Sequence, residues 1–291
     1  MAKTREYVLL WDSTMAIPNG DMLNDNRPRQ DETTGELEVS DVRIKRFVRD
    51  EWINKGLDVL VQTVEDDKGK IMTCSALISK ISKENKIKEE QLVEYLLDKY
   101  IDVKLFGAVI TKPKKDIMGP LQITWSRSVH EAEVKFIQGN AAYAGSEGKS
   151  QASIWSKYIT PYALFKTYGV YNDKVARRQG IKVEEDDLKL FVEGLLDGMK
   201  NYRSTSKNQM PRMLVEVIYN NNKIDGELNY IDFIKKVDDL EIRDIGQVEV
   251  KLNKLSKYYD DNKENIDLVN IYIHSNLNVE GLHEDFNIKT I

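Results

Sequence analysis

Residues 19–50 read NGDMLNDNRPRQDETTGELEVSDVRIKRFVRD, and they pass from a polar loop into a basic helix. No large apolar side chain lies between Leu23 and Leu37, so the loop half is not expected to belong to a hydrophobic core. Ser40 and Asp41 are favoured N-cap residues and predict a helix from residue 39 to 50. An amphipathic helix would turn its apolar side chains inward, namely Val42, Ile44, Phe47 and Val48. It would turn its cations outward, namely Arg43, Lys45, Arg46 and Arg49.

A loop of amides and guanidiniums beside a basic helix suits a phosphate backbone. Arginine offers phosphate a planar fork of donors, and asparagine can contact a sugar or a base edge. The plainer interpretation stays open, because a charged helix face is usually only solvated and Asn/Asp-rich loops usually form turns. The loop candidates for nucleic-acid contact are Asn19, Asn24, Asn26, Arg27 and Arg29.

The pattern N-G-D-x-L-N-D-N-R-P-R-x-D-x-x-T-G, followed by V-S-D-V-R-I-K-R-x-x-R-D, resembles the signature of a known family. This is the CRISPR-associated Cascade backbone family, the repeated "Cas-seven" subunit, with the type I-B branch most similar. Met22 stands where that family has proline, and no signature is found after about residue 220. Further similar blocks are GPLQITWSRSVH (119–130), VKFIQGNAAY (134–143), SEGK (146–149), YITPYALFKTYGV (158–170) and KNYRSTSKNQMPRML (200–214).

The order of expected elements indicates an α+β fold with a ferredoxin-like, RRM-like core. We expect strands at 6–11, 56–64, 121–128 and 213–219, and helices at 70–81, 88–100 and 185–203. Residues 134–143 and 154–162 predict a long hairpin. The resemblance implies an RRM-like palm (1–64 and 101–291), a thumb hairpin at about 134–162, and an inserted helical finger at 65–100. The aromatic sheet motif usual in RRM domains is not recognisable.

Composition sets outer bounds on location and partners. The net charge of −5 and the pI of about 5.5 argue against nucleic acid when taken alone. The acidic residues, however, cluster away from the basic helix. The single cysteine, Cys74, allows no intramolecular disulfide, which favours a cytoplasmic location; we expect it to be a small core residue. No signal peptide or membrane-spanning run is recognised.

Two further regions become candidate RNA contacts under the resemblance. Alternation in the strand at 121–128 places Gln122 on one face and Arg127 on the other, with Trp125 expected in the core. Lys149 is the only cation in the hairpin tip AGSEGKS. A second basic cluster, expected to form another wall of an RNA groove, consists of Arg203, Lys207, Gln209 and Arg212.

No catalytic residue, metal site or cofactor is expected. The three histidines lie far apart and lack ligand spacing, and no phosphate-binding glycine loop or serine elbow is present. Asp21 and Asp31 leave one alternative open, a metal-dependent endoribonuclease, because related type III backbone subunits use an aspartate in this loop. The simpler interpretation is that these aspartates cap turns.

The sequence therefore predicts a non-catalytic subunit that oligomerises along CRISPR RNA in a type I Cascade complex for antiviral defence. Expected partners are the CRISPR RNA, target DNA through guide pairing, head-to-tail copies of the chain and other Cascade subunits, with no membrane. A filament-forming protein scaffold, whose basic cluster binds another protein, is the second alternative.

Overall fold

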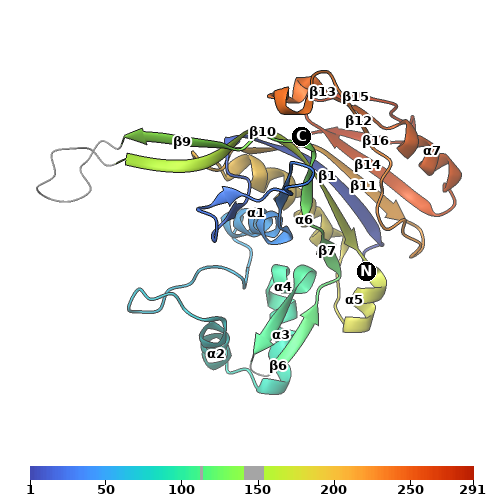
Figure 1. Ribbon diagram of the computed structural model, residues 1–291. Helices are drawn as coiled ribbons and strands as arrows, with labels where there is room; N and C mark the ends of the chain where they lie inside the picture. The colour runs from blue at the N-terminus through green and yellow to red at the C-terminus, as the bar shows by residue number, and fades with distance from the viewer. Residues whose placement is uncertain (112–113, 141–153) are drawn as a thin grey trace, which may run out of the picture.

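The computed structural model describes residues 1–111, 114–140 and 154–291 (Figure 1). Its central strand is β1 (Arg5–Ala16), which pairs antiparallel with β10 (Ile154–Tyr171) on one side and β11 (Gln209–Tyr219) on the other. The main sheet has the order β16-β14-β11-β1-β10-β8-β4, and β7 and β9 also pair with β10. The remaining strands of this sheet are β4 (Glu36–Val39), β7 (Leu121–Ile123), β8 (Ser126–Glu131), β9 (Lys135–Asn140), β14 (Ile266–Ile273) and β16 (Asn287–Thr290).

Consecutive side chains of β1 enter two different hydrophobic cores. Tyr7, Leu9 and Trp11 are buried in one, and Val8 and Leu10 in the other. Successive side chains of a strand point to opposite faces, so a sheet covered on both sides needs an unbroken apolar run. The predicted strand at 6–11 is therefore confirmed, and the structure extends it at both ends.

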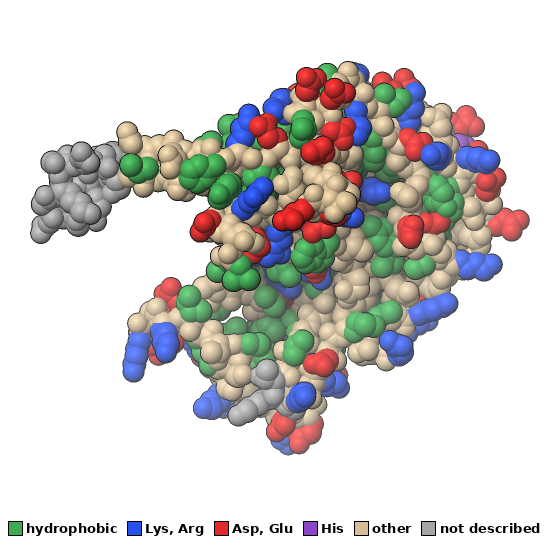
Figure 2. Space-filling model, viewed as in Figure 1, with side chains coloured by type: hydrophobic (Ala, Val, Ile, Leu, Met, Phe, Trp, Pro, Cys, Tyr) green, Lys and Arg blue, Asp and Glu red, His purple; other side chains and the backbone are tan. Residues whose placement is uncertain are grey.

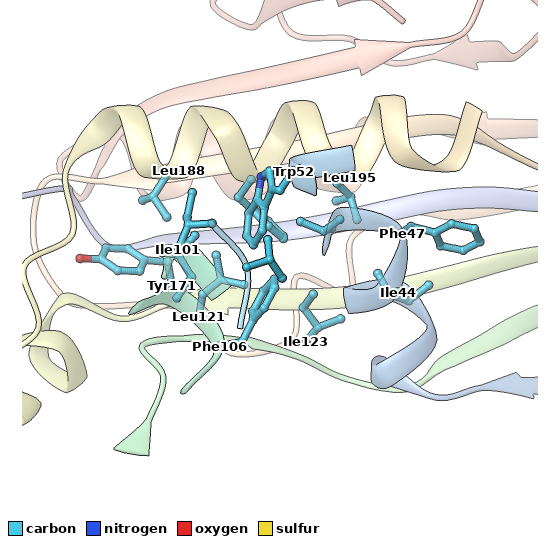
Figure 3. Packing of buried hydrophobic residues seen from close by; sticks show 14 of the residues in the cluster. Ile44, Phe47, Trp52, Ile101, Phe106, Leu121, Ile123, Tyr171, Leu188 and Leu195 are labelled. Atoms are coloured by element: carbon cyan, nitrogen blue, oxygen red, sulfur yellow. The ribbon is translucent and has the colours of Figure 1, made fainter. Parts of the chain in front are cut away.

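Helices α1 (Asp41–Asn54) and α6 (Glu185–Asn201) cover the first face, in agreement with the helices expected there. Figure 3 shows their core, in which the rings of Trp52 and Phe106 stack with centroids 5.5 Å apart. A Cβ atom at Gly198 of α6 would lie 2.3 Å from the carbonyl oxygen of Phe47 in α1. Glycine at this position is what lets the two helices pack so closely.

Most of the region after residue 220 covers the opposite face of the main sheet, while its strands β14 and β16 belong to the sheet itself. It forms a three-stranded sheet in the order β12-β13-β15 together with α7 (Asn253–Asp261). Its strands are β12 (Asp232–Lys235), β13 (Val248–Lys251) and β15 (Asn278–Glu280). Short helices elsewhere are α5 (Asp173–Gln179), η1 (Glu89–Gln91), η2 (Asp239–Glu241) and η3 (Ile245–Gln247).

The segment between α1 and β7 carries short helices and a hairpin. The two helices expected here are confirmed with shifted bounds, as α2 (Cys74–Glu84) and α3 (Leu92–Lys99). They are followed by α4 (Ile101–Phe106) and by a hairpin of β5 (Gly107–Thr111) and β6 (Lys114–Met118). The expectation that Cys74 is a core residue is wrong, because it lies exposed in the first turn of α2.

The strand expected at 56–64 is also wrong. This segment is irregular, and two of its backbone N–H groups bond to a side chain instead of a neighbouring strand. The carboxylate of Asp102 accepts the N–H groups of Leu60 at 2.8 Å and Val61 at 3.0 Å. A distant carboxylate thus replaces the strand partner that the alternating residues had suggested.

An arm projects from the body where β9 pairs with the first third of β10, from Ile159↔Lys135 to Ile154↔Asn140 (Figure 1). This pairing confirms the predicted hairpin strands, and the rest of β10 continues into the main sheet as an 18-residue strand. Trp155 lies over Gly139 on the facing strand, where an added Cβ would come within 2.4 Å of the indole ring. In the described part of the chain, no helix is both long and apolar enough to cross a membrane.

Candidate nucleic-acid interface

The loop of residues 19–39 is held by its own turns. Strands β2 (Gly20–Asp21) and β3 (Arg27–Pro28) form a minimal hairpin, closed by Asp25 and Asn26 with φ of 51° and 56°. The carboxylate of Asp21 accepts the N–H of Leu23 at 3.2 Å and the amide of Asn24 at 2.7 Å, and these bonds lower its pKa. Asp21 therefore stabilises a turn, as the simpler interpretation of the loop proposed.

Asn19 joins this loop to helix α1. Its Oδ1 atom accepts hydrogen bonds from the backbone N–H and the hydroxyl of Ser40, both at 2.9 Å. Ser40 does occupy the N-cap position, but its side chain makes no capping bond to the helix. The loop and the first turn of α1 are consequently fixed to each other by a single asparagine side chain.

The outward direction expected for all four cations of α1 needs correction. Arg49 is buried, and its Nε donates to Asp102 at 2.9 Å. Val42, which was expected to face inward, is 64% exposed, while Ile44, Phe47 and Val48 are buried as expected. The buried face of the helix is rotated toward Arg49 because Asp102, far away in the sequence, supplies a charge partner inside the protein.

Two other cations of α1 are paired within the helix. Lys45 contacts Asp41 at 2.8 Å, and Arg46 contacts Asp50 at 2.7 Å. Ion pairs of this kind between residues four apart contribute little to stability. Both cations thus have a carboxylate partner of their own within the helix.

Arg43 has no such partner. Its guanidinium lies 4.0 Å from the ring centre of Phe47 and 5.2 Å from that of Tyr202. The Nε and Nη2 atoms are buried without a hydrogen-bond acceptor in the described structure, and burial lowers the pKa of Arg43. A buried guanidinium with free donors is costly unless an acceptor arrives.

The turn between α6 and β11 brings a second cation, Lys207, to Arg43. Lys207 donates from Nζ to the carbonyl of Ile17 at 2.7 Å, which places the turn against the end of β1. Burial and the nearby charge of Arg43 lower the pKa of Lys207 to about 8. Arg203, in the same turn, is exposed.

The base of the arm adds Lys157, whose Nζ donates to the carbonyl of Thr205 at 3.3 Å. We call Arg43, Lys157, Arg203 and Lys207 the unpaired cation cluster, because none forms an ion pair with a carboxylate in residues 1–111, 114–140 or 154–291. They come from α1, from the arm and from the turn before β11. The sequence analysis did not name Lys157 as a candidate. The only signal in the sequence was its position in a strand of the predicted hairpin.

Gln209 and Arg212 do not line a surface as expected. Gln209 is fully buried, and neither its amide nitrogen nor its oxygen has a partner among the described residues. Arg212 donates to Asp12 at 2.7 Å and is mostly buried. The reason is that β11 begins at residue 209, so this part of the predicted loop lies inside the sheet.

A second polar area lies on the other side of the loop. Arg27 lies 5.8 Å from the ring centre of Tyr158, and Arg29 lies 5.6 Å from that of Trp125. These four residues, with Glu38, line an open cavity of about 540 Å³, which we call the loop pocket. Placing Trp125 in the core was wrong, since it is 49% exposed. The strand is interrupted between β7 and β8, which frees residue 125 from the alternation.

The remaining predicted contacts are arranged differently. Arg127 is surrounded by acids, at 2.7 Å from Asp31, 3.3 Å from Glu36 and 3.7 Å from Glu38. Gln122 is exposed and donates to the carbonyl of Gly119 at 2.7 Å. Lys149 lies outside the described residues.

Carboxylates of the loop do not gather into a metal site. Asp31 accepts the N–H of Thr33 at 2.9 Å, and its turn bonds lower its pKa. Within the described ranges, no group of three or more His, Cys, Asp or Glu side chains is arranged to hold a metal ion. Figure 2 shows the surface hollowed between the arm and the lobe that carries α2.

Comparison with known proteins shows which family this chain belongs to. A model of the family described as CRISPR-associated protein Cas7 matches residues 3–253, more than four fifths of the chain. This chain belongs to the Cas7 family. A CRISPR-associated protein Cas7 of Haloferax volcanii (strain DS2) is 25% identical over 244 residues, and the match covers 74% of this chain and 70% of that protein.

Solved structures share the fold of this Cas7-family chain. A chain described as a CRISPR RNA-guided surveillance complex, pre-nicking, has a TM-score of 0.55 at 13% identity and covers 99% of this chain and 96% of its own. A second, described as a CRISPR RNA-guided surveillance complex, has a TM-score of 0.52 at 14% identity, with 94% and 89% covered. At such low identity these likenesses show the fold alone, a mixed α+β architecture around one central sheet.

Proposed function

We propose that this protein is a non-catalytic backbone subunit of a type I Cascade surveillance complex, most like the type I-B branch, that oligomerises along one CRISPR RNA. Membership of the Cas7 family supports the class of complex. The observation that carries the RNA-binding role is the unpaired cation cluster. Lys157 lies at the base of the arm and contacts the turn that carries Lys207, and none of the four cations forms an ion pair with a described carboxylate.

The cluster suits the sugar–phosphate backbone. Arg43 presents donors that no described residue accepts from, and a phosphate oxygen would satisfy them. Lys207, next to it, has a lowered pKa that an approaching phosphate would raise again. Backbone contacts hold an RNA without reading its sequence, so guide pairing with target DNA remains free to supply specificity.

The architecture supports a division into palm, finger and thumb. The strand order β11-β1-β10-β8, with α1 and α6 packed together, is the order expected of a ferredoxin-like palm formed by residues 1–64 and 101–291. The helices within 65–100 then act as an inserted finger, and the arm at about 134–162 acts as the thumb. In the proposed assembly the thumb crosses the RNA and contacts the next copy, head to tail, while other subunits bind around it.

Two rival functions make different predictions. A metal-dependent endoribonuclease would use Asp21 or Asp31, yet both carboxylates are engaged in the turns of their own loop. A protein scaffold would use the cations for a protein partner. Incubation of labelled RNA with the purified protein and a divalent ion separates the three functions, because cleavage supports the nuclease and absence of binding supports the scaffold.

The decisive variant is Arg43→Ala combined with Lys207→Ala. We expect affinity for single-stranded RNA to fall by about tenfold or more, since two charge-assisted contacts are removed. Arg178→Ala with Lys182→Ala is the matched control, because both of these exposed cations lie around α5 and form no ion pair with a described residue. Equal affinities of the two double variants would refute the proposed role of the cluster.

A further inference from the structure

The N-cap residue of helix α1 uses its hydroxyl in an unusual direction. A serine at this position normally accepts a hydrogen bond from a backbone N–H of the first helical turn, which stabilises the helix. The hydroxyl of Ser40 instead donates to Oδ1 of Asn19 at 2.9 Å, and the side chain makes no capping bond to the helix. The start of α1 therefore lacks a stabilising bond and has a link to the loop in its place. Departures of this kind from local stability are expected where function requires them.

The link through Asn19 connects two arginines on different elements. The backbone carbonyl of Asn19 accepts the N–H of Arg29 at 3.3 Å, and its Oδ1 atom also accepts the backbone N–H of Ser40 at 2.9 Å. The carbonyl of Ser40 in turn accepts the N–H of Arg43 at 3.0 Å. Asn19 thus joins the backbone at Arg29 to the helical turn that carries Arg43. Glu38 holds Arg29 a second time, by an N–H that donates to its carbonyl at 2.9 Å, so the loop has other bonds that keep it folded.

The spacing of these two arginines matters for a ligand with a regular backbone. Arg43 belongs to the unpaired cation cluster, and Arg29 lines the loop pocket. Phosphate contacts fix the register of a protein on a nucleic acid. Cations that are already held at the right spacing bind without a further ordering cost. A residue that fixes this spacing can therefore raise RNA affinity without contacting RNA.

The two ends of the Asn19 side-chain amide can be assigned different roles. Its Oδ1 atom already accepts two hydrogen bonds from Ser40. Its amide nitrogen is the side-chain atom that could donate to an RNA phosphate, and within the described ranges it donates to no residue. We propose that Asn19 is a positioning residue for RNA binding, which acts through Oδ1 to hold Arg29 and Arg43 at a fixed spacing. This inference rests on the proposed RNA-binding function, and it replaces the direct RNA contact that the sequence had suggested for Asn19.

The test compares Asn19→Ala with Asn19→Asp in the full chain, by the affinity for a single-stranded RNA relative to the parent at two salt concentrations. Aspartate keeps an oxygen that Ser40 can donate to, but it replaces the amide nitrogen by a second oxygen. We expect Asn19→Ala to lower the affinity by about two- to tenfold, the range that a lost hydrogen bond represents. Asn19→Asp should restore most of the parent affinity, and more completely at the higher salt concentration, because salt screens the added charge.

Two further variants separate positioning from a general effect on stability. Ser40→Ala removes only the hydroxyl that donates to Asn19, so it should weaken binding less than Asn19→Ala and add nothing to it in the double variant. Asn172→Ala is the matched control, because the Oδ1 atom of Asn172 also accepts a backbone N–H at the start of a helix, that of Lys174 in α5, at 3.0 Å. This control should leave RNA affinity unchanged. Melting temperatures show which variants are folded, and Ser40→Ala carries the test if Asn19→Ala does not fold.

Several results would overturn the positioning role. An affinity of Asn19→Asp as low as that of Asn19→Ala at both salt concentrations would show that the amide nitrogen contacts RNA. Parent-like affinity of folded Asn19→Ala, losses that add in the double variant with Ser40→Ala, or an equal loss with Asn172→Ala would also contradict it. The parent still binds RNA in all of these cases, so the proposed function survives. A parent protein that does not bind RNA removes both the proposed function and this inference.

Discussion

Arg43 and Arg49 lie on the same helix and are chemically identical, but their surroundings give them opposite roles. Arg49 is held inside the protein by Asp102, whose carboxylate also fixes the backbone at Leu60 and Val61. Arg43 is partly buried, forms no ion pair with a described carboxylate, and keeps two donors without an acceptor among the described residues. We therefore propose a structural role for Arg49 and a binding role for Arg43, because their partners differ although the residue type is the same.

Arg49→Ala should therefore destabilise the fold. It leaves the buried carboxylate of Asp102 without a countercharge, which typically costs about 3–5 kcal/mol. Arg46→Ala, which removes a more exposed cation from its pair with Asp50, should cost less, about 1 kcal/mol. Urea unfolding of both variants measures the difference, and similar small losses would show that Arg49 is not structural.

Lys207 should make RNA binding dependent on pH. Its pKa is lowered from 10.5 to about 8 in the folded protein, so raising the pH from 7 to 9 removes the charge that a phosphate contacts. Affinity should fall over this interval, and Lys207→Gln should weaken binding at pH 7 and flatten the dependence. Binding measured at constant ionic strength tests this, and an unchanged pH profile in the variant contradicts it.

The lowered pKa of Lys207 affects folding stability in the opposite direction from RNA binding. Between about pH 8 and 10.5 the unfolded chain keeps the Lys207 proton that the folded protein has released. The unfolded state then binds more protons, so the contribution of Lys207 to stability rises with pH over this range. Weaker RNA binding at pH 9 would therefore not reflect any loss of folding caused by this lysine.

At the scale of elements, the sequence predicts those helices and strands that depend on the local pattern of apolar and polar residues. The burial of Ile44, Phe47 and Val48 in α1 follows from periodicity, and the paired strands of the arm follow from their pattern and from the glycine- and serine-rich tip between them. The burial of Arg49 was not predictable, because its partner lies 53 residues away. Nor was the exposure of Trp125, which depends on a break between β7 and β8. The loop signature identified the region of the candidate site, but not which of its cations lack partners.

The arm carries apolar side chains that its own two strands leave uncovered. Phe136 is 52% exposed and Ile154 is 72% exposed. Phe136→Ser with Ile154→Ser should leave the melting temperature nearly unchanged, since exposed substitutions usually cost less than about 0.5 kcal/mol. It should reduce assembly of several copies on one RNA, which light scattering measures. The control, Ile234→Ser with Leu240→Ser, removes comparably exposed side chains from the C-terminal region, and equal assembly of the two variants would contradict the role of the arm.

At the scale of the whole molecule, a net charge of −5 is combined with a local cluster of unpaired cations. Copies of an acidic protein repel one another over distances set by the ionic strength. RNA bound along the cation clusters would neutralise those charges and hold neighbouring copies in register. We therefore expect the proposed assembly to form on RNA and not in its absence.

Particle mass should consequently depend on RNA length. We expect the purified protein to be of low mass when free of nucleic acid, and the mass of its complex to increase in steps as longer single-stranded RNAs of unrelated sequence are supplied. Each neutralised phosphate releases counterions, so assembly and affinity should both decline steeply with added salt. Sedimentation at two salt concentrations, with RNAs of increasing length, measures both effects. Filaments that form without RNA would instead favour the scaffold, and a single copy on every RNA, whatever its length, would rule out a backbone role.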